Sequence, residues 1–259
     1  MYFNQFSELN ACIKTYPNGT QKITCWNKGV YYNPYDSNTS DSKLNKSKKI
    51  NSNEQLTLTK SSTPVTRSDS LKRAKDKIFD IAFVNENLWE YMITFTLDSN
   101  VIDRYDTQLI NKKLKTWLNN SVKRHNLNYL IIPELHKDGA VHFHGLISGD
   151  FNFIDSHRVD KSNRKIYNLS NWKFGFSTAV PLDNNKIAVC KYITKYITKD
   201  LVNDNSKILG NIYYAGGHDL IRDVPKSYTH IDFDSFEGSE YSIPSTNIKV
   251  KYGIIGFLG

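Results

Sequence analysis

The chain lacks the cysteine pattern of a disulfide-stabilised or thiolate-bound metal protein. It has three cysteines in 259 residues, Cys12, Cys25 and Cys190, and they lie far apart. An odd number without paired spacing predicts neither a disulfide framework nor a cysteine zinc site. It is compatible with a reducing cytoplasm.

Long hydrophobic runs are also absent. No apolar stretch of about 18 residues occurs, so we expect no membrane-spanning helix and no membrane partner. The first residues, MYFNQFSELN, contain no basic region followed by an apolar run, so we expect no secretory signal peptide. We therefore expect the protein to act in the cytoplasm.

Acidic residues are fewer than basic ones. The chain has 34 Lys and Arg against 26 Asp and Glu, a net charge of +8. This balance favours a polyanionic partner, with nucleic acid ahead of an anionic membrane surface. The 16 tyrosines fit that partner, because tyrosines among basic residues suit base stacking, although most aromatic side chains belong in a core.

Composition divides the chain into three parts. Residues 34–67 are rich in Asn, Ser, Thr and Lys, which predicts a flexible linker after a small hairpin in residues 1–33. We expect an N-terminal extension at 1–67, an ordered domain at 68–230 and a C-terminal tail at 231–259, where structural signals are sparse.

Hydrophobic periodicity predicts the elements of the central domain. The expected order is a helix beginning at Ser68 or Asp69, a strand at 91–98, a helix at about 105–125, a hairpin at 131–147, an irregular stretch at 150–172, a strand at 173–182, a helix from Asp183 or Asn184 to about Asp200, and a strand at 211–217. This order predicts an α+β fold, in which helices pack against an antiparallel sheet, and not a doubly wound parallel sheet.

The segment ELHKDGAVHFH within the hairpin carries the first chemical signal. A three-residue loop that ends with Gly139 in the left-handed conformation places Glu134 opposite His142. Ile132 then lies opposite His144. Because side chains alternate along a strand, Glu134, His142 and His144 share one face of the hairpin. Directly opposite residues have Cβ atoms about 4.5–5.5 Å apart.

Two imidazoles and one carboxylate on one face form a candidate metal site. This mixed set suits Mn²⁺, Mg²⁺ with weaker affinity, or Zn²⁺. The alternative is the polar face of an ordinary hairpin, and His-x-His alone favours that alternative. The register of Glu134 across the turn favours the metal site. His136 lies on the same face near the turn, and we expect it to be an exposed turn residue and not a fourth ligand.

The repeat KYITKYITK carries the second signal. It places Tyr192 and Tyr196 four residues apart, on one face of a helix and away from the apolar stripe that contains Cys190 and Ile193. A packed tyrosine pair with solvated lysines is the alternative interpretation. The lysines that repeat at the same spacing, and that near a phosphate could hold substrate and favour phenolate, are Lys191, Lys195 and Lys199.

The two signals together predict a reaction at a phosphodiester. A metal ion stabilises the charge that develops on phosphate oxygens. Tyrosine is a weak nucleophile at its ordinary pKa near 10 and gains from such help. The basic face of the first predicted helix, with Lys72 and Arg73, suits a polyanion. The combination indicates transesterification at a DNA phosphate through a covalent phosphotyrosine.

The same motifs resemble those of the HUH endonucleases, the rolling-circle replication initiators. VHFHGLI is similar to their His-hydrophobic-His motif, and YMITFTLD, with Thr94 and Thr96, resembles their first motif. KYITKYITK is similar to the two-tyrosine motif of initiators from small single-stranded-DNA phages such as microviruses. The three motifs occur in the family's order, and the resemblance covers about residues 68–230.

The resemblance implies an RRM-like sheet, Mn²⁺ or Mg²⁺ as cofactor, and nicking and joining of single-stranded origin DNA. It implies a 5′-phosphate joined to tyrosine, and a free 3′-OH that a host polymerase extends in the bacterial cytoplasm. Because no G-x-x-x-x-G-K-[ST] motif occurs, a host helicase is expected to unwind the DNA. The residues matched are Glu134, His142 and His144 as metal ligands, Tyr192 and Tyr196 as nucleophiles in an order left open, and Lys72, Arg73, Thr94, Thr96, Lys191, Lys195 and Lys199 as candidate DNA contacts.

Two other functions stay open. A plasmid mobilisation relaxase shares the chemistry, but relaxases commonly use a third histidine as ligand, where this chain has Glu134. A non-catalytic single-stranded-DNA-binding module would keep the basic charge and the aromatic residues. The presence of both tyrosines and all three ligand types argues against that module.

Overall fold

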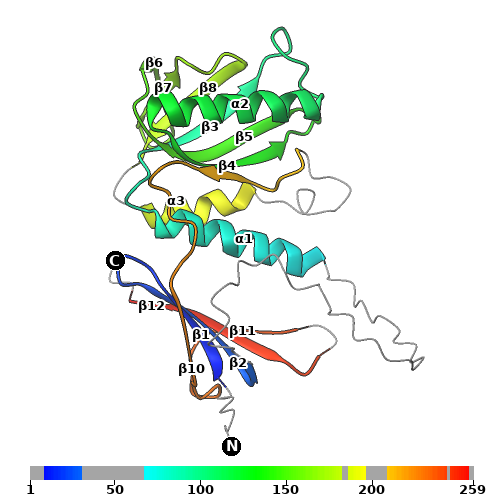
Figure 1. Cartoon of the computed structure of the whole chain (residues 1–259), viewed down its shortest axis with the longest axis vertical. Helices are drawn as coiled ribbons and strands as arrows, with labels where there is room; N and C mark the ends of the chain where they lie inside the picture. The colour runs from blue at the N-terminus through cyan, green and yellow to red at the C-terminus, as the bar shows by residue number, and fades with distance from the viewer. Residues whose placement is uncertain (1–8, 31–66, 183–185, 197–208, 244–245, 257–259) are drawn as a thin grey trace, which may run out of the picture. The chain divides into compact units, whose positions relative to one another are not determined.

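The computed structural model describes residues 9–30, 67–182, 186–196, 209–243 and 246–256. The chain forms two compact units, each with an antiparallel sheet (Figure 1). Three α-helices accompany the sheets in the described part, so the predicted α+β class is confirmed. Among these residues no helix is long and apolar enough to cross a membrane.

The first unit is a five-stranded sheet built from both ends of the chain. Its order is β10-β1-β2-β12-β11, and the hairpin predicted within residues 1–33 is β1–β2. The strands are β1 (Leu9–Thr15), β2 (Gln21–Val30), β10 (Lys226–Thr229), β11 (Ser239–Ser242) and β12 (Lys249–Ile255).

A buried asparagine ties the two ends together. The Asn10 side-chain amide donates to the carbonyl of Ile231 (2.7 Å), and its oxygen accepts from the Ile231 N–H (2.8 Å). Ala11 pairs with Thr229, and Cys25 with Lys251. The structure thus differs from the predicted separate extension and tail.

The reason for this difference is the separation of the partners in the chain. Pairing between strands more than 200 residues apart leaves no local signal, and the four-residue strands β10 and β11 are too short for alternation to stand out. The predicted linker, residues 34–67, lies outside the described residues except for Arg67, where the first helix begins.

The second unit, residues 64–224, holds a seven-stranded sheet in the order β6-β7-β8-β3-β5-β4-β9. Its strands are β3 (Tyr91–Leu97), β4 (Asn128–Leu135), β5 (Val141–Ser148), β6 (Phe153–Val159), β7 (Lys165–Leu169), β8 (Gly175–Pro181) and β9 (Tyr214–Gly216). Its helices are α1 (Arg67–Val84), α2 (Thr107–His125), α3 (Lys186–Ile193) and the 3₁₀ turn η1 (Thr194–Tyr196).

Two predictions for this unit are wrong. Residues 150–172, expected to be irregular, contain the hairpin β6–β7, whose alternation is broken by a bulge between Asp155 and Arg158. The tyrosine helix was expected to run to about Asp200, but α3 ends at Ile193 and tightens into η1. The Thr194 hydroxyl donates to the carbonyl of Lys191 (2.7 Å), which favours this tighter turn.

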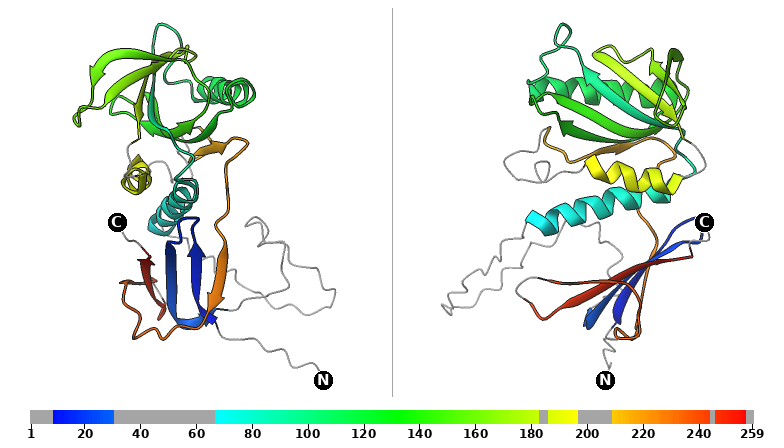
Figure 2. Two further views of the ribbon diagram at one scale, coloured as in Figure 1. Left: turned by 90° about the vertical axis from the view of Figure 1, so that its left-hand side faces the viewer. Right: turned by 180° about the vertical axis from the view of Figure 1, so that it is seen from behind.

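The two faces of this sheet have different roles. On one face Phe95 stacks on Trp172 (4.2 Å between ring centroids) and meets the edge of Trp117 from α2. Burial of each such ring stabilises the fold by roughly 2–3 kcal/mol. On the opposite face lie α1 and α3 (Figure 2). The predicted chemical residues belong to this second face.

Removal of residues 226–259 tests the pairing of the chain ends. It deletes three of the five strands of the first unit and leaves the β1–β2 hairpin, and an isolated hairpin is marginally stable in water. We expect the amides of residues 9–30 to lose hydrogen-exchange protection while those of β3, β4 and β5 keep theirs. Unchanged protection in residues 9–30 would show that the hairpin does not depend on the C-terminal strands.

Candidate active site

The hairpin β4–β5 has the predicted register. Glu134 pairs with His142 and Ile132 with His144. Gly139 has a φ of +83° and its N–H donates to the carbonyl of His136 (2.8 Å), as a three-residue loop with a left-handed glycine requires. The three predicted ligands therefore lie on one face of adjacent strands.

Asp138 stabilises the turn below these residues. Its carboxylate accepts from the Ala140 N–H (3.0 Å) and also contacts Arg104 (3.5 Å) and His136 (3.3 Å). The backbone hydrogen bond from Ala140 is the largest cause that lowers the pKa of Asp138 below its ordinary value. The carboxylate stays ionised near neutral pH and holds the loop that fixes the register.

His144 is the centre of the site. Its Nε2 lies 2.8 Å from Oε2 of Glu134, and its Nδ1 lies 3.1 Å from the hydroxyl of Thr94 on β3. Burial lowers the pKa of His144 to about 4, and the neighbouring His142 adds to the shift. A neutral ring satisfies both contacts if Nε2–H donates to Glu134 and Nδ1 accepts from Thr94. Burial also raises the pKa of Glu134, and the charge of His142 opposes that rise.

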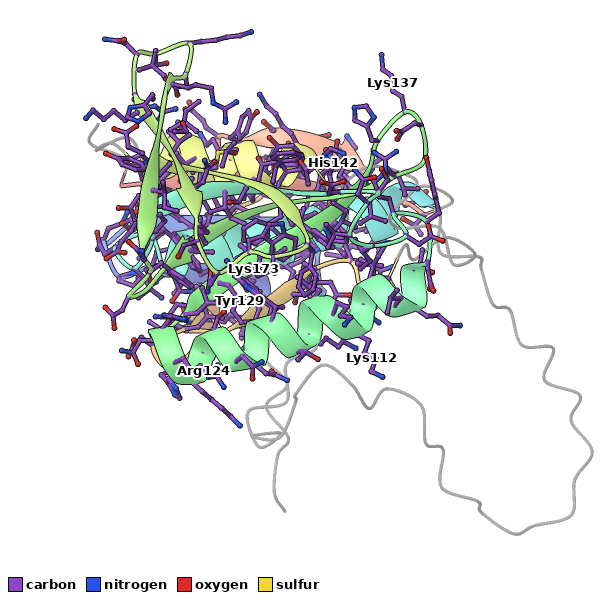
Figure 3. All side chains as sticks on the ribbon, turned by 90° about the horizontal axis from the view of Figure 1, so that it is seen from above. Lys112, Arg124, Tyr129, Lys137, His142 and Lys173 are labelled. Carbon is purple, nitrogen blue, oxygen red and sulfur yellow. The ribbon has the colours of Figure 1, made fainter. Side chains whose placement is uncertain are left out.

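His142 points to a different partner. Its ring stacks on the exposed ring of His136, with centroids 5.0 Å apart and planes at 19°. Figure 3 shows His142 near the turn that carries Lys137. Burial and the neighbouring His136 lower the pKa of His142. The described residues contain no group of three or more His, Cys, Asp or Glu arranged to hold a metal ion, so the predicted convergence is not complete.

The residues nevertheless fit a divalent ion in kind. The Glu134 oxygen and the His144 nitrogen are 2.8 Å apart, close to the roughly 3 Å between neighbouring ligands of an octahedral ion with bonds near 2.1 Å. Thr94 is the outer partner that commonly orients a ligating imidazole. His142 belongs to the same face, opposite Glu134.

Both predicted nucleophiles lie at this face. The Tyr196 ring stacks on His144, with centroids 3.7 Å apart and planes at 7°. The Tyr196 hydroxyl donates to the Tyr192 hydroxyl (3.0 Å), and the two rings meet edge to face. Cys190 and Ile193, from the predicted apolar stripe, are buried. The predicted common face of the two tyrosines is therefore observed.

The electrostatics separate the two tyrosines. Burial raises the pKa of Tyr196, and its hydrogen bond to Tyr192 and the charge of Glu134 raise it further. Tyr192 is 40% exposed and accepts the hydrogen bond. The ammonium of Lys195 lies over the Tyr192 ring at 4.8 Å from its centroid and does not contact the phenolic oxygen, in contrast to the predicted role of the lysines.

The remaining predicted residues surround the site. Lys191 is exposed on α3, and Thr96 pairs with His142 across β3 and β5. On α1, which packs against α3, Lys72 is half-buried and Arg73 is exposed. Lys199 lies outside the described residues, as do the proposed helix caps Asp183 and Asn184.

Three features were missed from the sequence. They are the His136 stack on His142, the Thr94 hydrogen bond to His144, and the position of Phe176, which pairs with Thr96 at the end of the same row. The motif YMITFTLD indicated a strand, but only its pairing with β5 brings Thr94 to His144. No local pattern specifies which strands become neighbours.

The pKa of His144 gives a test of the metal-free site. The folded ring binds its proton only near pH 4, whereas an unfolded histidine binds it near pH 6.5, so the stability associated with His144 falls as pH drops through this window. NMR titration in EDTA should give neutral His144 ring shifts at pH 5.5 and a midpoint near 4. A midpoint at or above 6.5 would mean that Glu134 holds a charged imidazolium.

A family comparison covers the segment that contains these residues. The model of the replication-associated protein family named for ORF2 and the gene 2 protein matches residues 90–201, from the start of β3 to beyond both tyrosines. No match was found among curated proteins or among solved structures. Through residues 90–201 the chain belongs to this family of replication-associated proteins, the phage rolling-circle replication initiators.

Proposed function

We propose that the protein initiates replication by nicking and rejoining single-stranded origin DNA through a covalent phosphotyrosine. One observation carries this proposal: the Tyr196 ring lies directly on His144, which in turn contacts Glu134. A tyrosine pair next to a carboxylate–imidazole pair has no need of this arrangement for packing alone, because Tyr192 remains 40% exposed. Membership in a replication-initiator family gives the substrate class.

Glu134, His142 and His144 would hold the metal ion, with Mn²⁺ or Mg²⁺ as the ion of choice for this donor set. When bound, the ion would polarise the phosphodiester and stabilise the negative charge on its oxygens. The side chain of His142 would turn from His136 toward Glu134, since both belong to one face. Thr94 would hold the ring of His144 in the orientation needed.

Tyr192 is the better placed first nucleophile. It is exposed, and its oxygen already accepts a hydrogen bond from Tyr196, a contact that favours developing negative charge on that oxygen. Its attack forms the tyrosine O–P bond and breaks the P–O3′ bond, and the phenolic proton leaves to solvent while the 3′ oxygen takes one up. Tyr196 would serve the second cleavage, after Tyr192 has been joined to DNA.

Basic residues around the tyrosines would bind the phosphates that flank the nick. Lys191 and Lys195 lie on the same turn as the tyrosines, and Arg73 is exposed on the neighbouring helix α1. We include Lys72 and Lys199 in this set from their sequence positions. A 3′-OH released here would be extended by a host polymerase, with a host helicase to unwind the duplex, in the cytoplasm of the host bacterium.

A covalent-adduct assay tests this function. The protein is incubated with Mn²⁺ and a tiled set of single-stranded oligonucleotides from its own genetic element, and adducts are separated on a denaturing gel. We expect an adduct in wild type and in Tyr196→Phe, and none in Tyr192→Phe. An adduct in Tyr192→Phe but not in Tyr196→Phe would reverse the assigned order. An adduct that persists in the double variant would remove both tyrosines from the chemistry.

Removal of the metal ion or its ligands separates catalysis from binding. EDTA and His144→Ala should each abolish the adduct while salt-sensitive binding to the same oligonucleotide persists, because phosphate contacts by lysine and arginine do not need the ion. Binding without any adduct in wild-type protein is the result that the non-catalytic module predicts. Loss of binding together with cleavage in His144→Ala would mean that the histidine has a structural role.

Thr94 provides a finer test of the site. Thr94→Val keeps the side-chain shape but removes the hydroxyl that contacts Nδ1 of His144. Loss of an outer partner of a ligating histidine typically costs about 10–100-fold in metal affinity or activity, and we expect that range in Mn²⁺ titrations of adduct formation. Thr94→Ser retains the hydroxyl and should stay near wild type. Equal behaviour of the two variants would exclude the orienting role.

A further inference from the structure

A row of side chains crosses the sheet and passes through the candidate metal ligands. Glu134 on β4 pairs with His142 on β5, His142 with Thr96 on β3, and Thr96 with Phe176 on β8. Directly paired residues of antiparallel strands point to the same face of the sheet. Phe176 therefore belongs to the face that carries the histidines. It lies two strands from His142, about 10 Å at a strand spacing of about 4.8 Å.

Phe176 is the most exposed of the large hydrophobic side chains in the described residues, at 71%. Its neighbours along β8 behave in the opposite way, since Ser177 and Ala179 are buried on the face that α2 covers. A single exposed hydrophobic side chain is common on protein surfaces. What distinguishes Phe176 is its place in the row of the ligands.

The backbone that carries Phe176 is held in place. Gly175, directly before it, has a φ of +149°, and a Cβ there would overlap the carbonyl oxygen of Thr96. The Asp98 N–H also donates to the carbonyl of Phe174 (2.9 Å). The start of β8 is thus fixed against the end of β3, and the phenyl ring projects from a rigid base.

We propose that Phe176 is a stacking platform for an unpaired base of the DNA strand, close to the phosphate that the tyrosines attack. An aromatic ring on an open antiparallel sheet face suits a base of single-stranded DNA, because each base has a planar π-face and stacking does not need a particular sequence. A base pair would present no free face to the ring. The inference rests on the proposed function of the site, and it assigns the ring to substrate positioning and not to the chemical step.

The test uses two fluorescein-labelled 30-nucleotide probes at fixed salt in EDTA. One is a mixed-sequence single strand, and the other has the same phosphates but abasic sites in place of all bases. Fluorescence anisotropy gives the dissociation constant of each for the wild-type protein and for Phe176→Ala, Phe176→Leu and Phe176→Trp. Tyr105→Ala is the matched control, because Tyr105 is an exposed aromatic residue outside the row.

We expect Phe176→Ala to weaken binding of the mixed strand by about 5- to 150-fold, the range for loss of one base–aromatic stack. Phe176→Leu should weaken it similarly, because leucine is apolar but has no planar face, and Phe176→Trp should restore it. Binding of the abasic strand should not change in any of these variants. Thermal unfolding should also stay near wild type, since the side chain is already exposed.

The outcomes distinguish this inference from the proposed function. If wild type forms the covalent adduct but Phe176→Ala binds the mixed strand as tightly as wild type does, the platform is wrong and the function stands. If no adduct forms but Phe176→Ala selectively weakens binding of the strand with bases, the platform stands and the function is wrong. Equal loss on both probes, or equal loss in Tyr105→Ala, would overturn the stacking role.

Discussion

The register between β4 and β5 is the constraint on which the rest of the site depends. A shift by one residue would turn every side chain of one strand to the opposite face. His142 and His144 would then point toward the aromatic core under α2, and Phe143 toward the tyrosines. The turn prevents this shift, because Gly139 takes a left-handed conformation and Asp138 binds the Ala140 N–H. The chemistry thus depends on a loop that need not touch the substrate.

The site can be viewed as two layers on one face of the sheet. In the first layer, strands β4, β5 and β3 supply Glu134, the two histidines and Thr94. In the second, α3 and η1 bring the tyrosines onto His144. The opposite face is closed by α2 and its aromatic core, and Figure 3 shows Lys112 and Arg124 on that helix, apart from His142. This division lets one face remain open for DNA while the other stabilises the sheet.

Local sequence patterns predicted those parts of the site that depend on short-range geometry. The pairing of Glu134 with His142 follows from a three-residue turn, and the common face of Tyr192 and Tyr196 follows from helical spacing. Contacts between separate elements were beyond such reasoning. The stack of Tyr196 on His144, the bond from Thr94 and the position of Phe176 all require knowledge of which elements become neighbours. The sheet that joins the chain ends was missed for the same reason.

The central claim is that the ion binds under the tyrosines, and paramagnetic NMR with Mn²⁺ tests it most directly. Substoichiometric Mn²⁺ should broaden the signals of His142, His144 and Tyr196 first and leave those of α2 around Arg124 sharp. In His144→Ala this selective broadening should disappear. Broadening that begins elsewhere, or that is uniform over the protein, would contradict a metal site at this face.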